Sequence, residues 1–163
     1  MSLLDAPAYD PTADNRKRNI IIAAIATIFL LIVLAFTGYV SGHGWLFTNL
    51  GAEHKINRFF VALEAKDYAT AYGIYNNDPA WQQHPQQYSG YPLQRFTEDW
   101  TTFSPIKAPI TQHHVDKSIS DGSGALGTGV IVAVRVNGDN KVFMYVNKTD
   151  GTITWPAPHM FEY

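Results

Sequence analysis

The sequence predicts an α+β protein, with one N-terminal transmembrane helix followed by a domain of three helices and a four-stranded antiparallel sheet. Three observations support this prediction. Residues 20–36 form an apolar run that no charged residue interrupts, residues 52–103 place apolar side chains at helical spacing, and the residues after Pro105 alternate with a period of two. Helices and strands that follow one another in separate runs are typical of α+β domains, in which helices pack on one face of a sheet.

The predicted transmembrane helix covers residues 19–40. Thr27 is the only polar residue in the apolar run, and the extension to Val40 gives a helix that spans roughly 30 Å, the thickness of a bilayer's hydrocarbon core. Three basic residues, 16–18, precede the helix, and the next basic residue in the chain is Lys55. By the positive-inside rule we expect a single-pass protein of the bacterial inner membrane, with a cytoplasmic tail (1–18) and a periplasmic domain.

A cleaved signal peptide is the alternative to a membrane anchor. Its apolar region would normally be shorter, and Val40-Ser41-Gly42 is only a tolerable cleavage site. The span contains no His, Asp, Glu, Lys or Arg, so neither ion conduction nor haem ligation within the hydrocarbon is expected of it. His43 lies just beyond the span. We expect an ordinary loop histidine there rather than a metal or pigment ligand.

Short segments flank the predicted helix. Residues 1–15 contain prolines and show no periodicity, which is typical of a tail without regular structure. Three glycines make residues 41–51 a short juxtamembrane connector. The domain, residues 52–163, is therefore expected to sit close to the bilayer.

Three sets of apolar residues at helical spacing predict the helices of the domain, and Asp67 and Pro92 mark the starts of the second and third. The sets are Ile56, Phe59, Phe60 and Leu63; Tyr68, Ala71, Tyr72 and Tyr75; and Leu93, Phe96, Trp100 and Phe103. A loop (79–91) with one short turn (80–83) separates the last two. Alternating segments separated by Gly- and Asn-rich turns predict strands at 110–119, 125–136, 141–148 and 152–155.

Residues 59–72, Phe-Phe-Val-Ala-Leu-Glu-Ala-Lys-Asp-Tyr-Ala-Thr-Ala-Tyr, and the later Asp150-Gly151 and Trp155 carry a resemblance to a known family. Over residues 52–158 the chain resembles the nuclear-transport-factor-two-like (cystatin-like) superfamily. The resemblance implies a cone-like domain with a pocket between helices and sheet. It does not imply one function, because the superfamily includes isomerases, hydrolases, ligand binders and interaction modules.

In enzymes of that superfamily the pocket holds a carboxylate, often with a His or Tyr partner. The candidate pocket residues here are Tyr68, Tyr72, Trp100, His113 and His114. Adjacent strand residues point to opposite faces, so at most one of the two histidines enters the pocket. The alternative is that one is exposed and the other lies at the sheet edge. No Asp or Glu lies on the apolar faces of the predicted helices, and no ligand set or phosphate loop is present, so we expect no catalytic residue, metal or cofactor.

Aromatic and Met side chains concentrate near the predicted membrane surface, in the loop and at the C-terminus. Protein interfaces are enriched in such residues, which makes them candidates for a partner interface. They are Trp45, Trp81, Tyr88, Tyr91, Met160, Phe161 and Tyr163. The alternative is that those of the loop and C-terminus close the open end of their own domain.

These features favour a non-catalytic accessory subunit of a multisubunit membrane complex, with the lipid bilayer and other membrane subunits as partners. A bacterial respiratory or photosynthetic complex is a natural host. A nucleic-acid partner is not expected, because the formal net charge is −2 and neither half of the chain is basic. The alternatives are a membrane-anchored small-ligand binder or sensor and, third, an isomerase- or hydratase-like enzyme.

The absence of cysteine excludes disulfides, thiolate metal sites and a Cys nucleophile.

Overall fold

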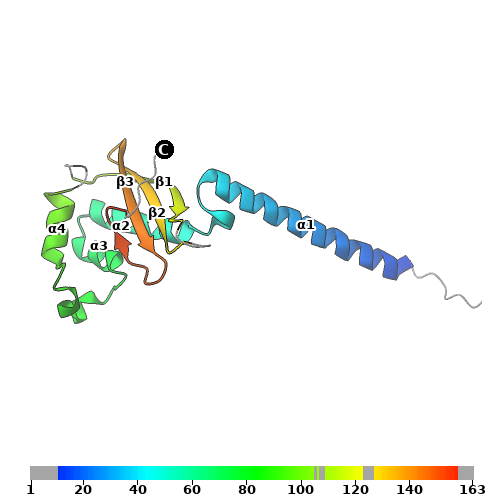
Figure 1. Cartoon of the computed structure of the whole chain (residues 1–163), viewed down its shortest axis with the longest axis horizontal. Coiled ribbons are helices and arrows are strands. Elements are labelled where there is room, and N and C mark those ends of the chain that lie inside the picture. The colour runs from blue at the N-terminus through cyan, green and yellow to red at the C-terminus, as the bar shows by residue number, and fades with distance from the viewer. Residues whose placement is uncertain (1–10, 105, 107–108, 123–126, 158–163) are drawn as a thin grey trace, which may run out of the picture.

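The computed structural model of the chain describes residues 11–104, 106, 109–122 and 127–157 (Figure 1). It confirms the predicted α+β class. The helical elements are α1 (Pro11–Ser41), η2 (Trp45–Phe47), α2 (Leu50–Glu64), α3 (Tyr68–Tyr75), η3 (Trp81–Gln83), η4 (Pro85–Tyr88) and α4 (Leu93–Thr101). The strands are β1 (His113–Ser120), β2 (Gly129–Val136), β3 (Asn140–Asn147) and β4 (Ile153–Thr154).

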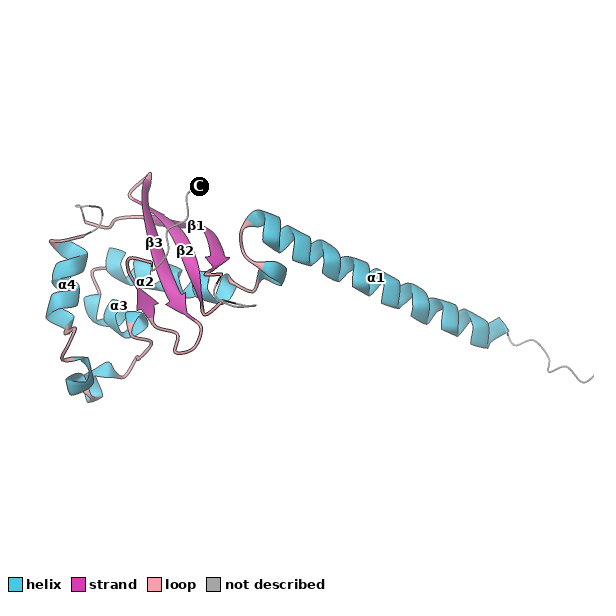
Figure 2. Ribbon diagram, viewed as in Figure 1, coloured by secondary structure: helices cyan, strands magenta, loops and turns pink. Residues whose placement is uncertain are grey.

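Helix α1 projects away from the domain as a single rod (Figure 2), and its apolar side chains are exposed almost throughout. Within the described residues it is the one helix long and apolar enough to cross a membrane. It starts at Pro11, so the prediction of a tail without regular structure is wrong from that residue onward. Proline is well suited to a first helical position, Asp14 complements the helix dipole in the first turn, and a long apolar helix propagates easily into its flanks.

The sheet has the order β1-β2-β3-β4, with every neighbouring pair antiparallel, as the hairpin turns predict. Three strands are shorter than predicted: β1 begins at His113 rather than at residue 110, β2 begins at Gly129 rather than at residue 125, and β4 has only two residues. The loop before β2 is closed by Asp121, whose carboxylate accepts hydrogen bonds from the backbone N–H and hydroxyl of Thr128.

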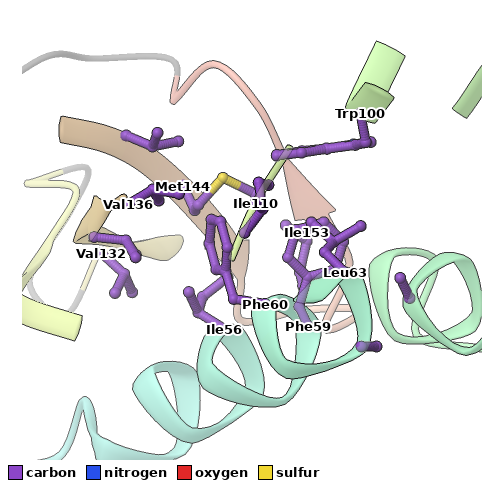
Figure 3. Packing of buried hydrophobic residues seen from close by; sticks show 14 of the residues in the cluster. Ile56, Phe59, Phe60, Leu63, Trp100, Ile110, Val132, Val136, Met144 and Ile153 are labelled. Atoms are coloured by element: carbon purple, nitrogen blue, oxygen red, sulfur yellow. The ribbon is translucent and has the colours of Figure 1, made fainter. Parts of the chain in front are cut away.

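The helices cover one face of the sheet, and the core lies between them (Figure 3). On that face β2 contributes four valines, Val130 through Val136 at every second position, all almost completely buried. Phe59, Phe60 and Trp100 belong to the same buried cluster and contact one another edge-to-face, with ring centroids 5.0–6.2 Å apart. Five large aromatic side chains, Phe59, Phe60, Tyr72, Phe96 and Trp100, are part of this core, so a small domain buries a large apolar area.

The helix ends follow local sequence rules. The predicted cap of α3 is confirmed, since Asp67 accepts a hydrogen bond from the backbone N–H of Thr70 at 3.0 Å. Helix α4 ends at Thr101, two residues short of Phe103. The predicted place of Phe103 on the buried face is therefore wrong: its ring is exposed and lies 5.8 Å below the guanidinium of Arg95.

Candidate functional site

The interior between helices and sheet, where the candidate pocket was expected, is filled by side chains. Tyr72 is completely buried and Trp100 nearly so, both as members of the hydrophobic core. The hydroxyl of Tyr72 donates a hydrogen bond to the backbone carbonyl of Tyr91 at 2.5 Å, and burial raises its pKa. Tyr68 is half-buried at the margin. The recess that includes Trp100 is lined by neither Tyr68, Tyr72 nor a histidine, and the recess that includes His113 and His114 is lined by none of the other three candidates.

The two adjacent histidines of β1 point to opposite faces, as predicted. His114 is exposed, with its Nε2 3.6 Å from Asp116. The ring of His113 stacks on Phe60, and its two nitrogens lie 2.7 Å from Glu64 Oε1 and 3.0 Å from Asn57 Oδ1. With both nitrogens engaged by α2, His113 ties the edge strand to the helix rather than facing a substrate.

A small recess of about 260 Å³ remains at one end of this interior. It is lined by Tyr75, Tyr91, Asp99, Trp100 and Trp155. Its carboxylate is already satisfied, because the Tyr91 hydroxyl donates to Asp99 at 3.0 Å and Arg95 pairs with Asp99 at 3.2 Å. Burial and the Asp99 hydrogen bond raise the pKa of Tyr91. Because the Asp99 carboxylate already accepts a hydrogen bond from Tyr91 and pairs with Arg95, it is poorly placed to act as a general base.

The loop aromatics are packed against their own domain. Trp81 meets Tyr72 edge-on with a centroid distance of 4.9 Å, and its indole N–H donates to the backbone carbonyl of Ala69. The Tyr88 hydroxyl donates to Asp78 at 2.6 Å, which raises the pKa of Tyr88 to about 12. Tyr91 packs on Tyr75. The contacts of all three are those expected of residues that close the domain. Of the other interface candidates, Trp45 is exposed, and Met160, Phe161 and Tyr163 lie outside the described residues.

The most elaborate polar arrangement lies where the rod meets the domain. We call it the junction: the last turn of α1 from Gly38, the connector through Asn49, and the side chains of Glu53 and Ser118 that hold it. The connector folds back on α1, with the backbone N–H of His43 donating to the carbonyl of Gly38 at 2.9 Å. It is therefore a compact turn rather than a flexible tether.

Two glycines allow the parts of the junction to approach closely. A side chain at Gly38 would place its first carbon 2.5 Å from the carbonyl oxygen of Gly44. Gly42 has a φ of +81° and accepts a hydrogen bond from the backbone N–H of Ser118 at 2.7 Å. That hydrogen bond joins the end of α1 directly to the edge strand of the sheet.

A buried carboxylate completes the junction. Glu53, near the start of α2, accepts a hydrogen bond from the Ser118 hydroxyl and lies 2.8 and 2.9 Å from Nδ1 of His43 through its two oxygens. The expectation that no acidic residue lies on an apolar helix face is thus wrong. Glu53 stands three residues before Ile56 and shares its buried stripe, and the burial is tolerated because both oxygens have partners. The spacing of Glu53 from Ile56 and Phe60 was the available sequence indication.

The junction also holds Asn49, which is buried and whose side-chain amide has no hydrogen-bond partner among the residues that the structure describes. Its amide lies against Gly44, where an added side-chain carbon would come within 2.8–2.9 Å of it. In the described part of the chain no group of three or more His, Cys, Asp or Glu residues could hold a metal ion. What the arrangement can do is mechanical: it fixes the direction of α1 relative to the sheet.

Comparison with protein-family models, with curated proteins and with solved structures found no match to this chain. The resemblance to the nuclear-transport-factor-two-like superfamily therefore stays a prediction.

Proposed function

We propose that the chain is a non-catalytic accessory subunit of a multisubunit membrane complex. In this proposal α1 spans the bacterial inner membrane with its N-terminus in the cytoplasm, and the domain braces partner subunits on the periplasmic side. The observation that carries the proposal is the junction. A hydrogen bond from Ser118 to Gly42 and the His43–Glu53–Ser118 contacts hold the domain at a fixed orientation to the rod, which is what a brace requires.

The surface of α1 supports the anchoring role. Its large apolar residues between Ile20 and Val40 are mostly 40–67% exposed. Isolated in water such a surface would be costly, at roughly 25 cal/mol per Å² of exposed apolar area. Lipid or the helices of partner subunits would cover it, and the basic residues 16–18 on the first turns favour the cytoplasmic side for the N-terminus.

The filled interior supports a role without catalysis. The side chains that would line a conical pocket are in contact with each other, and the histidine on the inward side has both nitrogens engaged. A ligand in that space would have to displace core aromatic rings. Loss of one such ring from a core typically costs about 3–5 kcal/mol, so the space is a poor binding site.

Co-purification from native membranes tests the proposal. We expect a C-terminally tagged full-length chain, extracted in mild detergent, to migrate on native gels with membrane subunits in fixed stoichiometry. A matched variant carries a flexible Gly/Ser insertion between Gly44 and Trp45, inside the junction, and a control carries the same insertion in the exposed turn at Gly138. The junction insertion should lower recovery of the complex while leaving the chain in the membrane, and the control should not.

A wild-type chain that purifies as a clean monomer from its native membrane would contradict the accessory-subunit role. Equal recovery of the complex with both insertions would show that a fixed orientation is not what the partners need.

A further inference from the structure

A groove of about 440 Å³ is lined by residues of α2, α3, η3 and the loop between α3 and η3. It is open to solvent between α2, α3 and η3, and its size falls in the range of small-molecule sites. Its lining residues are Gly51, His54, Lys55, Arg58, Ala69, Thr70, Gly73, Ile74, Asn77, Pro79, Trp81 and Gln82. None of them is acidic.

One wall of the groove is cationic. His54, Lys55 and Arg58 all lie on α2. No carboxylate in the described residues lies within ion-pair distance of His54 or Arg58. The Lys55 ammonium donates to the side-chain carbonyl of Asn77 and to the backbone carbonyl of Gly151. Both acceptors are neutral, so these contacts position the ammonium without cancelling its charge.

The positive charges of this wall are close enough to influence one another. Burial lowers the pKa of Lys55, Asp150 partly opposes that change, and the charge of Arg58 lowers the pKa further. An anion between the two side chains would remove their mutual repulsion and partly replace the water that Lys55 has lost.

The opposite wall is apolar and held in place. The Trp81 indole is fixed by its hydrogen bond to the Ala69 carbonyl and by its edge contact with Tyr72. Gly73 leaves room beside it, since an added side-chain carbon there would lie 3.3 Å from Cδ1 of the indole. Pre-formed apolar walls bind ligands without the cost of ordering side chains.

We propose that this groove binds a small organic anion, with its carboxylate, sulfonate or phosphate against Arg58 and Lys55 and its apolar body against Trp81. The site is separate from the interior and from the junction, and the proposal goes beyond the accessory role. A bare inorganic anion would leave the apolar wall unused, and a neutral apolar molecule would leave the cations unpaired, so both should bind more weakly.

Fluorine NMR of the full-length chain in neutral phosphatidylcholine nanodiscs tests the proposal. The chain has four tryptophans, so 5-fluorotryptophan labelling gives few resonances, and W81F identifies that of Trp81. The probe is naphthalene-2-sulfonate. We expect a saturable shift of the Trp81 resonance, with binding by the neutral naphthalene-2-sulfonamide at least about tenfold weaker because the charge-assisted contacts are lost.

Two arginine variants localise the site. R58Q should weaken sulfonate binding about tenfold, while the matched control R95Q, which removes an exposed arginine on α4, should leave binding unchanged. An unchanged Trp100 resonance in both variants shows that the core is intact. Equal affinity for sulfonate and sulfonamide, unchanged binding in R58Q, displacement by an equal concentration of inorganic phosphate, or a shift confined to Trp45 would each overturn the proposal. None of these outcomes bears on membrane anchoring.

Discussion

At the scale of single residues, Glu53 shows how a charged group is accommodated near the core. Its side chain is 10% exposed, and its oxygens are contacted by the Ser118 hydroxyl and by His43. A buried carboxylate is costly by itself and becomes tolerable when its oxygens are hydrogen-bonded. The main effect of removing the carboxylate on the free energy of unfolding should therefore come from the lost hydrogen bonds of Ser118 and His43.

Replacement of Glu53 by alanine tests this interpretation. E53A removes the acceptor contacted by the His43 ring and leaves the Ser118 hydroxyl only its longer 3.4 Å hydrogen bond to the Gly42 carbonyl, so we expect a loss of about 2–3 kcal/mol in the free energy of unfolding. Urea unfolding in detergent, followed by near-ultraviolet circular dichroism of the aromatic core, measures the change.

The control is E98A, which removes a carboxylate whose contact is a hydrogen bond from the exposed Gln94 amide. It should change the stability by no more than about 0.5 kcal/mol. Equal stability of E53A and E98A would show that Glu53 does not hold the junction.

At the scale of elements, the junction couples α1 to β1 and α2 by close backbone contacts. Gly38 lies on the last turn of α1, under the connector, and Gly42 is hydrogen-bonded to the edge strand. At Gly38 backbone atoms of the connector fill the space that an added side-chain carbon would need, and at Gly42 the φ of +81° disfavours any other residue, so a side chain at either position would require movement of the chain.

The substitution G38A tests the contact between Gly38 and the connector, because it favours the helix but places a carbon where the connector lies. Alanine favours a helix over glycine by about 1 kcal/mol, whereas the added carbon would lie 2.5 Å from the Gly44 carbonyl oxygen. We expect the clash to displace the connector and to broaden the distance distribution between α1 and the domain. Pulsed electron paramagnetic resonance between spin labels at A26C and S89C measures it, since the chain has no native cysteine.

Gly51 offers a matched control, because it is helical, is close in sequence and has no atom within 4 Å of an added side-chain carbon. G51A should leave the distance distribution narrow and stabilise the domain by about 0.4–1 kcal/mol. A distribution in G38A as narrow as in G51A would mean that the connector contact does not set the orientation.

At the scale of the whole molecule, an apolar rod and a compact domain face different solvents. The rod exposes apolar side chains on all sides, whereas the domain buries its aromatic residues between the helices and the sheet. The division agrees with a chain whose N-terminal helix lies in lipid and whose domain lies in water. In the proposed membrane arrangement the orientation is expected to follow charge, because the basic residues 16–18 precede the apolar run.

Single-cysteine labelling tests this orientation. In intact spheroplasts a membrane-impermeant maleimide should label S89C, in the exposed loop of the domain, and should label S2C only after lysis. Replacement of residues 16–18 by glutamine should reduce the orientation bias, because the positive charges before the span are lost. Labelling of S2C in intact spheroplasts would reverse the topology, and release of the protein by alkaline carbonate would exclude a membrane span.

The features that the sequence predicted correctly are those that depend on local patterns. The apolar run, the cap at Asp67 and the three hairpin turns depend on neighbours within a few residues, so periodicity and turn chemistry were sufficient. The start of α1 at Pro11 and the end of α4 before Phe103 were missed, because helix boundaries depend on end effects that a periodic pattern does not contain.

By itself the sequence determined the helix suited to a membrane, the α+β class and the absence of any cysteine chemistry. Only the tertiary structure decided that the interior is filled, that Glu53 meets Ser118 across 65 positions of the chain, and that Lys55 reaches Gly151 across 96. Contacts between residues so far apart depend on how helices and sheet pack in three dimensions. A repeating pattern in the sequence reports only on near neighbours, so it does not predict these long-range contacts.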